Sequence, residues 1–599
     1  MKVLLALALA VVASPACAAG ADWAVYGGGP EGNRYSTLTQ ITRENVAQLQ
    51  PAWIYSMDER GDPQTHPLAI GGVVYAYTPS LKVIALDGAS GTLKWQFDSG
   101  TEGRGAQRGL SWWSDGRENR LFASVMHDLY ALDPVTGKPL AGFGEGGHID
   151  LRRGLGHDED GYVTLTSPGV IFRDMIIVGF RTSESAPAPP GDIRAFDVHT
   201  GKLRWVFHTI PRPGEFGYRT WPKDAWKTAG SANNWTGMTL DVKRGILYVP
   251  TGSAVSDFYG ADRAGDDLFA NTLLALDAAT GKRLWHFQAV HHDILDRDFP
   301  SPPVLLTVRH DGRMVDAVAQ ATKQGFLFLL DRVTGKPLFP VSETAVPQSD
   351  VPGEASSPTQ PMPSLPAPYA RQHLTEDMLT QRTPEAHAWA LDQFRGFRSG
   401  GPFTPLSVDK QAVVFPGFDG GAEWGGQAAD PETGVLYLNA NDVAWTGGLQ
   451  VTADASHYQI TGYHKFLDPD GYPAVAPPWG TLNAIDLNTG QYLWKVPLGE
   501  YPELAAKGMA ATGSENYGGP ILTASGLLFI GATLYDKKIR AFDSRSGALL
   551  WQATLPYAGN ATPITYLAGG RQFILIQTDN ARDRKAPQGA AYAAFALPQ

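Results

Sequence analysis

The residues best suited to chemistry lie close together in VHHDILDRDFPSPP, which spans residues 290–303. This stretch carries three carboxylates, Asp293, Asp296 and Asp298, beside two adjacent histidines. Such crowding is costly unless the carboxylates are solvated, paired with a cation or used in catalysis. Lys323 follows downstream in AQATKQGFLFLLDR. The pattern makes these carboxylates candidates for a cation site or for catalysis, and an ordinary turn role for Asp296 is the alternative.

The element that must position this stretch is a repeated hairpin of the form apolar-x-Asp-x-x-Thr/Ser-Gly-x-x-x-Trp. Five full copies end at Trp95, Trp205, Trp285, Trp494 and Trp551, and two degenerate copies centre on Asp133 and Asp331. Each copy joins two strands of alternating apolar residues through an Asp-x-x-Thr-Gly turn, which is typical of a β-hairpin.

Seven such hairpins predict radially repeated β-blades. The gap between Asp331 and Asp486 has room for one more blade, suggested by VVFPGF and GVLYLNAN. We therefore predict an all-β, eight-bladed β-propeller with Trp-motif repeats over residues 20–599, with seven blades as the alternative. The C-terminal YAAFAL is expected to pair near the N-terminal strand and close the ring. Residues 290–303 follow the Trp285 hairpin, so we expect a loop that reaches the propeller axis.

An insert at about residues 341–398 departs from the repeat. Its first half is rich in proline, and its second half, HLTEDMLTQRTPEAHAWALDQF, has a weak helical pattern. Long loops in compact domains are usually either functional or a covering layer. The insert is therefore predicted either to cap the central site or to decorate the surface.

The N-terminus has the features of an export signal. Lys2 supplies a positive charge, residues 3–13 form an apolar run, and Pro15 precedes a group of small residues. We expect residues 1–19 to be a signal peptide and the rest of the chain to be periplasmic. A lipid anchor on Cys17 is the alternative. No later stretch reaches about 18 apolar residues, so no transmembrane segment is predicted.

Charge and cysteine content exclude several classes of protein. The chain has 49 Lys and Arg against 60 Asp and Glu, a balance that argues against a nucleic-acid partner. Cys17 is the single cysteine, so the mature chain should have no disulfide, thiolate metal site or covalently attached haem. A redox enzyme built on this chain would therefore pass its electrons to a separate carrier.

The sequence VHHDILDRDFPSPP, with ATKQG downstream, resembles the membrane-type glucose dehydrogenases that depend on pyrroloquinoline quinone (PQQ), in a soluble periplasmic form without their N-terminal membrane domain. The resemblance extends through FPGFDGGAEWGG, LYLNANDVAW, NYGGPILTASGLLFIGAT and the closing AFALP. It implies an oxidoreductase acting on CH–OH groups that holds PQQ with calcium or magnesium. The small-molecule substrate would be a sugar, polyol, hydroxy acid or alcohol, and the electron acceptor a quinone or a separate cytochrome.

The resemblance also implies roles for individual residues. Asp296 corresponds to the catalytic aspartate, which takes the hydroxyl proton while hydride passes to the C5 carbonyl of PQQ. Lys323 corresponds to the lysine that hydrogen-bonds this carbonyl. Trp235 matches the tryptophan beneath the PQQ rings, and Arg108 matches an arginine that binds a PQQ carboxylate. Taken singly, Trp235 as propeller core, Arg108 as a surface charge and Lys323 as an exposed strand-end lysine are the alternatives.

Further cofactor and metal positions follow from the same resemblance. Asn439 fits the asparagine beside the quinone oxygens, with Asn441 as the neighbouring alternative. Gln64 and Thr166 align with other cofactor-binding positions. The metal-binding positions are Asp296, Ser253 and Glu184. Because these residues offer oxygen ligands, either calcium or magnesium suits them.

Two departures from the family pattern concern the substrate entrance. Arg104 stands where glucose-type enzymes carry a histidine, and TDNARDRKAPQGAAY replaces a glycine-rich loop. If Arg104 and residues 582–585 line the entrance, their cations would favour an acidic or highly polar hydroxy compound. Solvation on the propeller rim is the alternative. His291 and His292 are expected to orient the loop rather than bind metal, because adjacent residues of an extended segment point in opposite directions.

A non-enzymatic propeller scaffold of the cell envelope is the competing class of protein, because a propeller fold does not by itself determine a function. Scaffolds of that kind lack the combination of Asp296, Lys323 and Trp235. These three residues therefore favour the enzyme over the scaffold.

Overall fold

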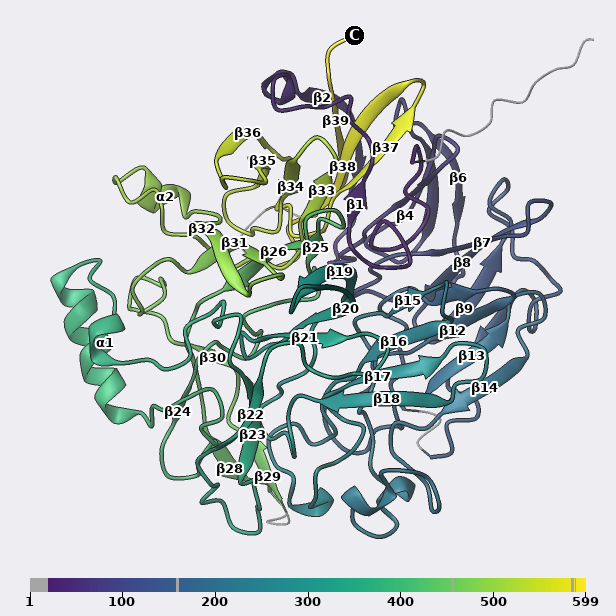
Figure 1. Ribbon diagram of the computed structural model, residues 1–599. Coiled ribbons are helices and arrows are strands. Elements are labelled where there is room, and N and C mark those ends of the chain that lie inside the picture. Colours follow the sequence, from purple (N-terminus) through teal and green to yellow (C-terminus); the bar gives the residue numbers. More distant parts are fainter. Residues whose placement is uncertain (1–19, 158–160, 454–456, 583–586, 588) are drawn as a thin grey trace, which may run out of the picture.

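The computed structural model describes residues 20–157, 161–453, 457–582, 587 and 589–599. The predicted signal peptide, residues 1–19, lies outside the described residues. Within them the α-helices are α1 (Pro384–Gly396) and α2 (Pro502–Ala505), and the remaining regular structure is mostly strand (Figure 1). The 3₁₀ helices are Val46–Gln48, Tyr218–Thr220, Ala225–Lys227, Ala261–Arg263 and Glu376–Met378. The prediction of an all-β fold is confirmed.

The described strands form eleven sheets, and the eight that follow one another along the chain are numbered here sheets 1 to 8. Sheet 1 holds β3 (Leu68–Ile70), β4 (Val73–Tyr77), β5 (Val83–Asp87) and β6 (Leu93–Phe97). Sheet 2 holds β7 (Ser111–Ser114), β8 (Asn119–Val125), β9 (Asp128–Leu132) and β10 (His148–Asp150). Sheet 3 holds β11 (Val170–Phe172), β12 (Met175–Val178), β13 (Ile193–Asp197) and β14 (Leu203–Phe207). Sheet 4 holds β15 (Thr239–Asp241), β16 (Ile246–Pro250), β17 (Thr272–Asp277) and β18 (Arg283–Gln288).

The remaining four sheets continue along the chain. Sheet 5 holds β19 (Val304–His310), β20 (Arg313–Ala321) and β21 (Leu327–Asp331). Sheet 6 holds β25 (Ala428–Ala429), β26 (Val435–Asn441), β31 (Gly480–Asp486) and β32 (Gln491–Pro497). Sheet 7 holds β1 (Tyr35–Ser36), β33 (Ile521–Thr523), β34 (Leu527–Ile530), β35 (Lys538–Asp543) and β36 (Leu549–Thr554). Sheet 8 holds β2 (Gln50–Met57), β37 (Ile564–Ala568), β38 (Arg571–Asp579) and β39 (Ala590–Ala596).

Smaller sheets lie in the connections between these eight. They are β22 (Val341–Ala345) with β23 (Thr359–Pro363), β28 (Leu449–Val451) with β29 (Tyr458–Ile460), and β24 (Ala412–Val414) with β27 (Trp445–Gly447) and β30 (His464–Lys465). The first of them falls in the proline-rich half of the insert at 341–398. The half predicted to be helical contains α1, which lies at the edge of the molecule (Figure 1).

The repeated turn has the same hydrogen bonds in copy after copy. In sheet 5 the Asp331 carboxylate accepts from the backbone N–H groups of Val333 and Thr334, at 2.9 and 2.8 Å. The N–H of Gly335 then donates to the Asp331 carbonyl at 2.8 Å. Asp therefore begins the turn because its side chain satisfies two N–H groups, and Gly ends it because φ is +72° there.

The seven predicted hairpins fall one to a sheet in sheets 1 to 7, but the predicted position of the additional blade was wrong. GVLYLNAN forms β26, which pairs with β31 of the Asp486 hairpin inside sheet 6. VVFPGF contributes only β24, in a small sheet. The additional sheet is sheet 8, where β39 pairs with β2 over Gln50–Met57 and Ala590–Ala596. The expected pairing of YAAFAL with an N-terminal strand is therefore confirmed.

Successive sheets are joined by an aromatic ring that lies on the turn glycine of the next sheet. The indole N–H of Trp285, in sheet 4, donates to the Arg332 carbonyl of sheet 5 at 3.2 Å. A Cβ on Gly335 would lie 2.6 Å from the same ring. The equivalent pairs are Trp53 with Gly91, Trp95 with Gly137, Trp205 with Gly281 and Trp494 with Gly547.

The other junctions between sheets use substitutes for this contact. Phe339 packs on Gly490 between sheets 5 and 6, and Ile149 packs on Gly201 between sheets 2 and 3. Trp551 of sheet 7 donates to the Leu49 carbonyl beside sheet 8, at 3.1 Å. Because Trp53 of sheet 8 contacts sheet 1, the contacts return to the sheet from which they started.

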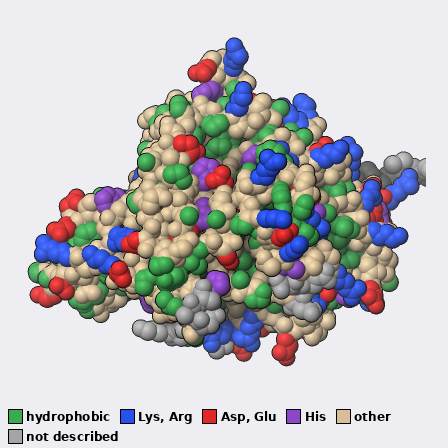
Figure 2. Space-filling view, turned by 90° about the horizontal axis from the view of Figure 1, so that it is seen from below, with side chains coloured by type: hydrophobic (Ala, Val, Ile, Leu, Met, Phe, Trp, Pro, Cys, Tyr) green, Lys and Arg blue, Asp and Glu red, His purple; other side chains and the backbone are tan. Residues whose placement is uncertain are grey.

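The surface is mixed in charge where it can be seen. Figure 2 shows acidic and basic side chains interspersed among neutral and apolar ones on one face. No helix among the described residues is long and apolar enough to cross a membrane.

We expect the contact between ring and glycine to be sensitive to a single methyl group. Gly335→Ala would add a Cβ 2.6 Å from the Trp285 ring, at a φ of +72°. Gly312→Ala, in the same sheet at a φ of +74°, meets nothing within 4 Å and is the matched control. The control should lose about 1 kcal/mol through strain alone. Gly335→Ala should lose about 1–3 kcal/mol more, through overpacking.

Denaturant or thermal unfolding at a fixed scan rate would measure both variants against the wild-type chain. Equal midpoints for the two variants would contradict the structural role of the contact.

Candidate active site

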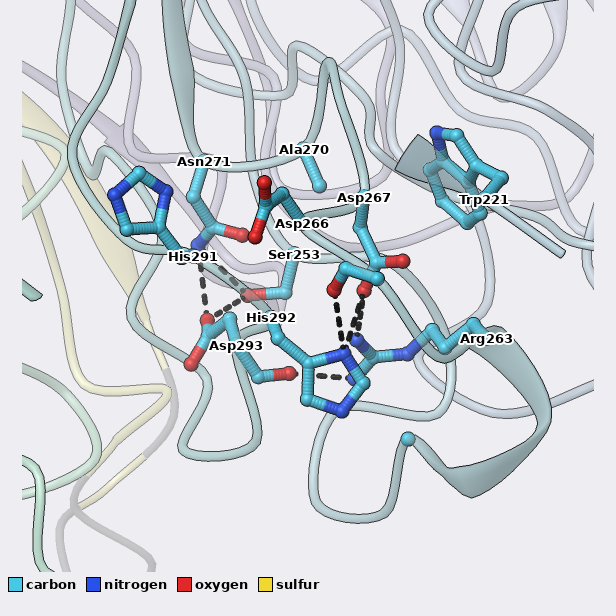
Figure 3. Close-up of polar contacts among 12 residues, drawn as sticks. Trp221, Ser253, Arg263, Asp266, Asp267, Ala270, Asn271, His291, His292 and Asp293 are labelled. Carbon is cyan, nitrogen blue, oxygen red and sulfur yellow. Dashed lines mark hydrogen bonds and ion pairs between the residues drawn. The ribbon is translucent and has the colours of Figure 1, made fainter. Parts of the chain in front are cut away.

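The three aspartates of the loop at 290–303 make different contacts. Asp293 holds the loop in its conformation through hydrogen bonds (Figure 3). One Asp293 oxygen accepts from the backbone N–H of Arg297 at 2.6 Å and from the Asn271 amide at 2.9 Å. It also accepts from the Ser253 hydroxyl. The other oxygen accepts from the Leu295 N–H at 2.9 Å. A carboxylate occupied on both oxygens is a poor candidate for a catalytic base.

Asp298 holds a tryptophan in place. Its Oδ2 accepts from the indole N–H of Trp235 at 2.8 Å, and its Oδ1 accepts from the backbone N–H of Ser253 at 2.5 Å. A Cβ at position 252 would lie 2.6 Å from the same carboxylate, so Gly252 is required for this close approach. The carbonyl of Trp235 is fixed as well, because Thr166 and Arg108 donate to it at 2.8 and 3.3 Å.

Asp296 lines the cavity together with Asp298. Its φ of +53° is in the left-handed region, which is uncommon for a residue other than glycine. Its Oδ1 lies 2.8 Å from the ammonium of Lys323, which also lies 3.8 Å from Asp298. Gly420 packs against the Lys323 backbone, where a Cβ would approach Cα to 2.9 Å.

These side chains line one cavity of about 480 Å³. The residues predicted from the sequence that line it are Gln64, Arg108, Thr166, Glu184, Trp235, Ser253, Asp296 and Lys323. They come from connections between successive sheets or from turns within sheets 3, 4 and 5. Residues more than 250 positions apart in the chain therefore meet in one place because the sheets are arranged side by side.

The cavity contains more carboxylates than the sequence predicted. Asp257, four residues after Ser253, joins Glu184, Asp296 and Asp298 in the lining. Burial and the charges of Asp296 and Asp298 raise the pKa of Asp257 well above its usual value. Burial also raises the pKa of Asp296, even though the ammonium of Lys323 opposes this shift. In the sequence, Asp257 ends the motif PTGSAVSD, which also contains the predicted metal-binding residue Ser253. This proximity was the signal that could have identified Asp257.

Aromatic and cationic side chains form another part of the lining, referred to below as the wall. The Arg108 guanidinium lies 5.0 Å from the ring of Trp235 and 5.2 Å from that of Trp424. Burial lowers the pKa of Arg108 to about 10. Trp424, in FPGFDGGAEWGG, also lines the cavity and was not predicted from the sequence. Buried atoms of this wall have no hydrogen-bond partner in the described chain: Gln64 Oε1, Arg108 Nε and Trp424 Nε1.

Asn439 is not among the residues that line the cavity, and its role beside the quinone stays a prediction. It lies on β26, where its amide donates to Asn516 Oδ1 at 2.6 Å. Asn441, two residues along the same face, donates to the Asn516 carbonyl at 2.9 Å. Both asparagines are therefore engaged with Asn516 in a buried network that supports sheet 6.

His291 and His292 are not in the lining of the cavity and contact other segments of the chain. Figure 3 shows His292 beside Asp267. The His292 ring lies 3.3 Å from the carboxylate of Asp267 and 2.9 Å from that of Glu354, a residue of the insert. Burial disfavours its charge, but hydrogen bonds to these two carboxylates raise the pKa of His292 to about 9. His291 lies 3.1 Å from Glu343, also in the insert.

The insert is therefore attached to the loop at 290–303 through His291 and His292. None of its described residues lines the cavity.

The structure places the residues predicted at the substrate entrance in different surroundings. Arg104 is exposed and does not line the cavity, although Gly105 and Ala106 beside it do. Arg582 lines the cavity and forms an ion pair with Asp62 at 2.9 Å. Residues 583–585 lie outside the described residues.

Comparisons with known proteins agree with this geometry. Residues 23–574 match the family model described as "PQQ: Glucose/ethanol/alcohol dehydrogenase, beta-propeller domain". The glycerol dehydrogenase large subunit of Gluconobacter oxydans is 32% identical over 650 residues, covering 98% of this chain and 86% of that protein. Quinoprotein glucose dehydrogenase A of Acinetobacter calcoaceticus is 32% identical, covering 96% of this chain and 79% of that protein.

A solved structure shares the fold. The quinohemoprotein alcohol dehydrogenase from Comamonas testosteroni superposes with a TM-score of 0.72 at 23% identity, covering 96% of this chain and 80% of that one.

We expect the carboxylate cluster to bind a divalent cation, and Asp257→Asn to weaken that binding by about tenfold or more, because it removes one charged oxygen ligand. Calcium should raise the melting temperature of the wild-type chain more than that of the variant. Without calcium the variant should be no less stable than wild type, because it relieves repulsion among buried carboxylates.

Asp192→Asn, which alters a buried carboxylate outside the cavity, is the control. Equal calcium responses in all three proteins would show that Asp257 does not contact the ion.

Proposed function

Because the chain belongs to the family of PQQ-dependent glucose, ethanol and alcohol dehydrogenases, we propose that it oxidises the hydroxyl group of a sugar- or alcohol-type substrate in the cavity of Asp296 and Lys323. The observation that carries this proposal is the 2.8 Å pair between these two side chains, inside a cavity walled by Trp235 and Arg108. Family membership also decides against the non-enzymatic scaffold. We further propose that each of the eight sheets is one blade of the propeller.

The wall residues fit a planar, anionic quinone. Arg108, Gln64 and Trp424 present buried polar atoms without a partner, and the Trp235 indole offers an apolar face. Arg108 would hold a cofactor carboxylate, and Trp235 and Trp424 would flank the rings. When bound, PQQ supplies the group that accepts the two electrons of the oxidation. Thr166 serves the cofactor indirectly, because its hydroxyl fixes the carbonyl of Trp235.

The carboxylates fit a hard divalent cation. Asp296, Glu184 and the added Asp257 supply charged oxygens, and Ser253 lies beside them. Calcium and magnesium both prefer such ligands. A bound cation supplies positive charge that polarises a nearby carbonyl. It also offsets the repulsion among these carboxylates.

Asp296 would accept the proton of the substrate hydroxyl. An alcohol gives up hydride readily only as its proton is removed, so the base must lie at the reacting end of the cavity. Only the carboxylate form of Asp296 can accept a proton. The Lys323 ammonium at 2.8 Å favours that form against the burial that raises the pKa of Asp296, and a bound cation would favour it further. Lys323 would also donate a hydrogen bond to the reacting carbonyl of the cofactor.

The route of the electrons and the location of the protein are part of the same proposal. Covalent attachment of haem needs cysteine thiols, and Cys17, in the predicted signal peptide, is the only cysteine of the sequence. Electrons would therefore leave to a quinone or to a separate cytochrome. The charge and apolar run of residues 1–19 support export to the periplasm.

Binding of the cofactor tests the proposal directly. PQQ should raise the melting temperature of the cofactor-free chain when calcium or magnesium is present, because a ligand of the native state stabilises it. Arg108→Lys, which keeps the charge but loses the planar guanidinium, should reduce the shift. No PQQ-dependent shift with either metal would overturn the quinoprotein assignment for this chain.

Replacing the base tests the roles. Asp296→Asn keeps the shape of the side chain but removes its ability to accept a proton. Turnover should fall by about a hundredfold to ten-thousandfold, while PQQ still raises the melting temperature. Steady-state rates with an artificial acceptor would measure the loss. A variant that keeps more than about a tenth of the wild-type rate would place the base elsewhere.

A further inference from the structure

A second cavity of about 380 Å³ adjoins the first, and we will call it the outer cavity. Asp419, Trp445 and Arg582 line both cavities, so they form the boundary between them. Its volume lies within the range of small-molecule sites. We propose that the outer cavity binds the second ring of a neutral, polyhydroxylated substrate such as a disaccharide. This inference rests on the proposed function, because the first ring must reach Asp296.

Aromatic rings form rigid walls in the outer cavity. Trp445 meets Phe418 edge to face, with ring centroids 5.9 Å apart and an interplanar angle of 89°. Tyr535 stacks on Tyr501 at 4.6 Å and 23°. Tyr517 adds a third ring to the lining. Aromatic faces of this kind suit the apolar faces of sugar rings, and rings already packed lose little freedom on binding.

Each of the two described cations in this lining is paired with a carboxylate that lies outside the lining, and the lining also contains two carboxylates, Asp419 and Asp579. Arg582 lies 2.9 Å from Asp62, and its guanidinium stacks 3.9 Å from the Tyr517 ring. Lys465 lies 2.6 Å from Glu515. Since both described cations of the lining have carboxylate partners, neither is free to select an anionic substrate. This outcome favours a neutral compound over the acidic one suggested by the basic residues of the sequence.

Polar atoms remain for hydroxyl groups. Asn560 is 1% exposed and lines the outer cavity, yet its Oδ1 has no hydrogen-bond partner among the described residues. A buried acceptor without a partner is costly unless a ligand supplies a donor. At the boundary, Asp419 accepts from the Tyr517 hydroxyl at 2.9 Å and faces both cavities.

Because the two cavities share lining residues, one substrate can extend from the first cavity into the outer cavity. The first cavity must hold the cofactor, the cation and the reacting carbinol, so a larger substrate extends across the boundary at Trp445. Binding energy from a remote, non-reacting part of a substrate can be used to orient the reacting part. The disaccharide should therefore be preferred in kcat/KM and not only in affinity.

Tyr535→Ala tests the inference, because Tyr535 lines only the outer cavity and is 38% exposed, which lowers the risk of misfolding. The wild-type holoenzyme should oxidise maltose, cellobiose or lactose with a kcat/KM at least equal to that for glucose. The variant should lose about tenfold of the disaccharide value and keep its glucose value within about twofold. Phe216→Ala, an exposed aromatic residue in neither lining, is the matched control.

Several outcomes would overturn the inference. One is an unchanged ratio of disaccharide to glucose kcat/KM in Tyr535→Ala. A second is activity confined to small alcohols. A third is a variant whose rate changes only with the concentration of an artificial quinone acceptor, since the outer cavity would then serve the acceptor.

A measurement without turnover keeps this inference separate from the proposed function. Saturation-transfer NMR can detect maltose binding to the full chain without PQQ, and the signal should weaken in Tyr535→Ala. An enzyme inactive on every hydroxyl compound would refute the proposed function. Maltose binding that is absent, or equal in both proteins, would refute the outer-cavity site.

Discussion

The indole of Trp285 lies on Gly335, in a turn whose φ of +72° and close packing leave no room for a side chain. The same contact, or a substitute with Phe339 or Ile149, joins the other sheets in turn. Each ring therefore fixes the orientation of one sheet against the next through packing and, at Trp285, through a hydrogen bond. Because these contacts lie in the hairpin turns, the connections between sheets are left free to form the site.

Because packing between the turns stabilises the ring of sheets, the site can contain carboxylates that destabilise the folded chain. Glu184, Asp257, Asp296 and Asp298 lie in one buried cavity with the ammonium of Lys323. Excess negative charge in a cavity destabilises the folded chain unless it is compensated. The packed sheets provide stability elsewhere, and a divalent cation would compensate the remainder. Binding the cation and preparing the base are thus two results of the same electrostatic arrangement.

The features that could be predicted from the sequence are those that depend on neighbouring residues. Seven hairpins were evident because each turn needs an Asp carboxylate and a Gly with positive φ, whereas sheet 8 lacks that turn and is built from both ends of the chain. Asp296 and Lys323 were predicted because their surrounding motifs resemble a known family. Asp257 and Trp424 were missed because only the packing of distant connections brings them to the cavity. The sequence also could not show that the Asn439 amide donates to Asn516, since this contact depends on how distant segments pack.

Sheet 8 also determines when the chain can complete its fold. It pairs Gln50–Met57 with Ala590–Ala596, so its contacts have nearly the greatest sequence separation that this chain allows. Contacts of high order form late and slowly. The edge of β2 must stay unpaired until β39 has been synthesised. For a chain threaded unfolded through a translocation channel, as the proposed export would require, this topology delays circular closure until β39 has emerged on the far side.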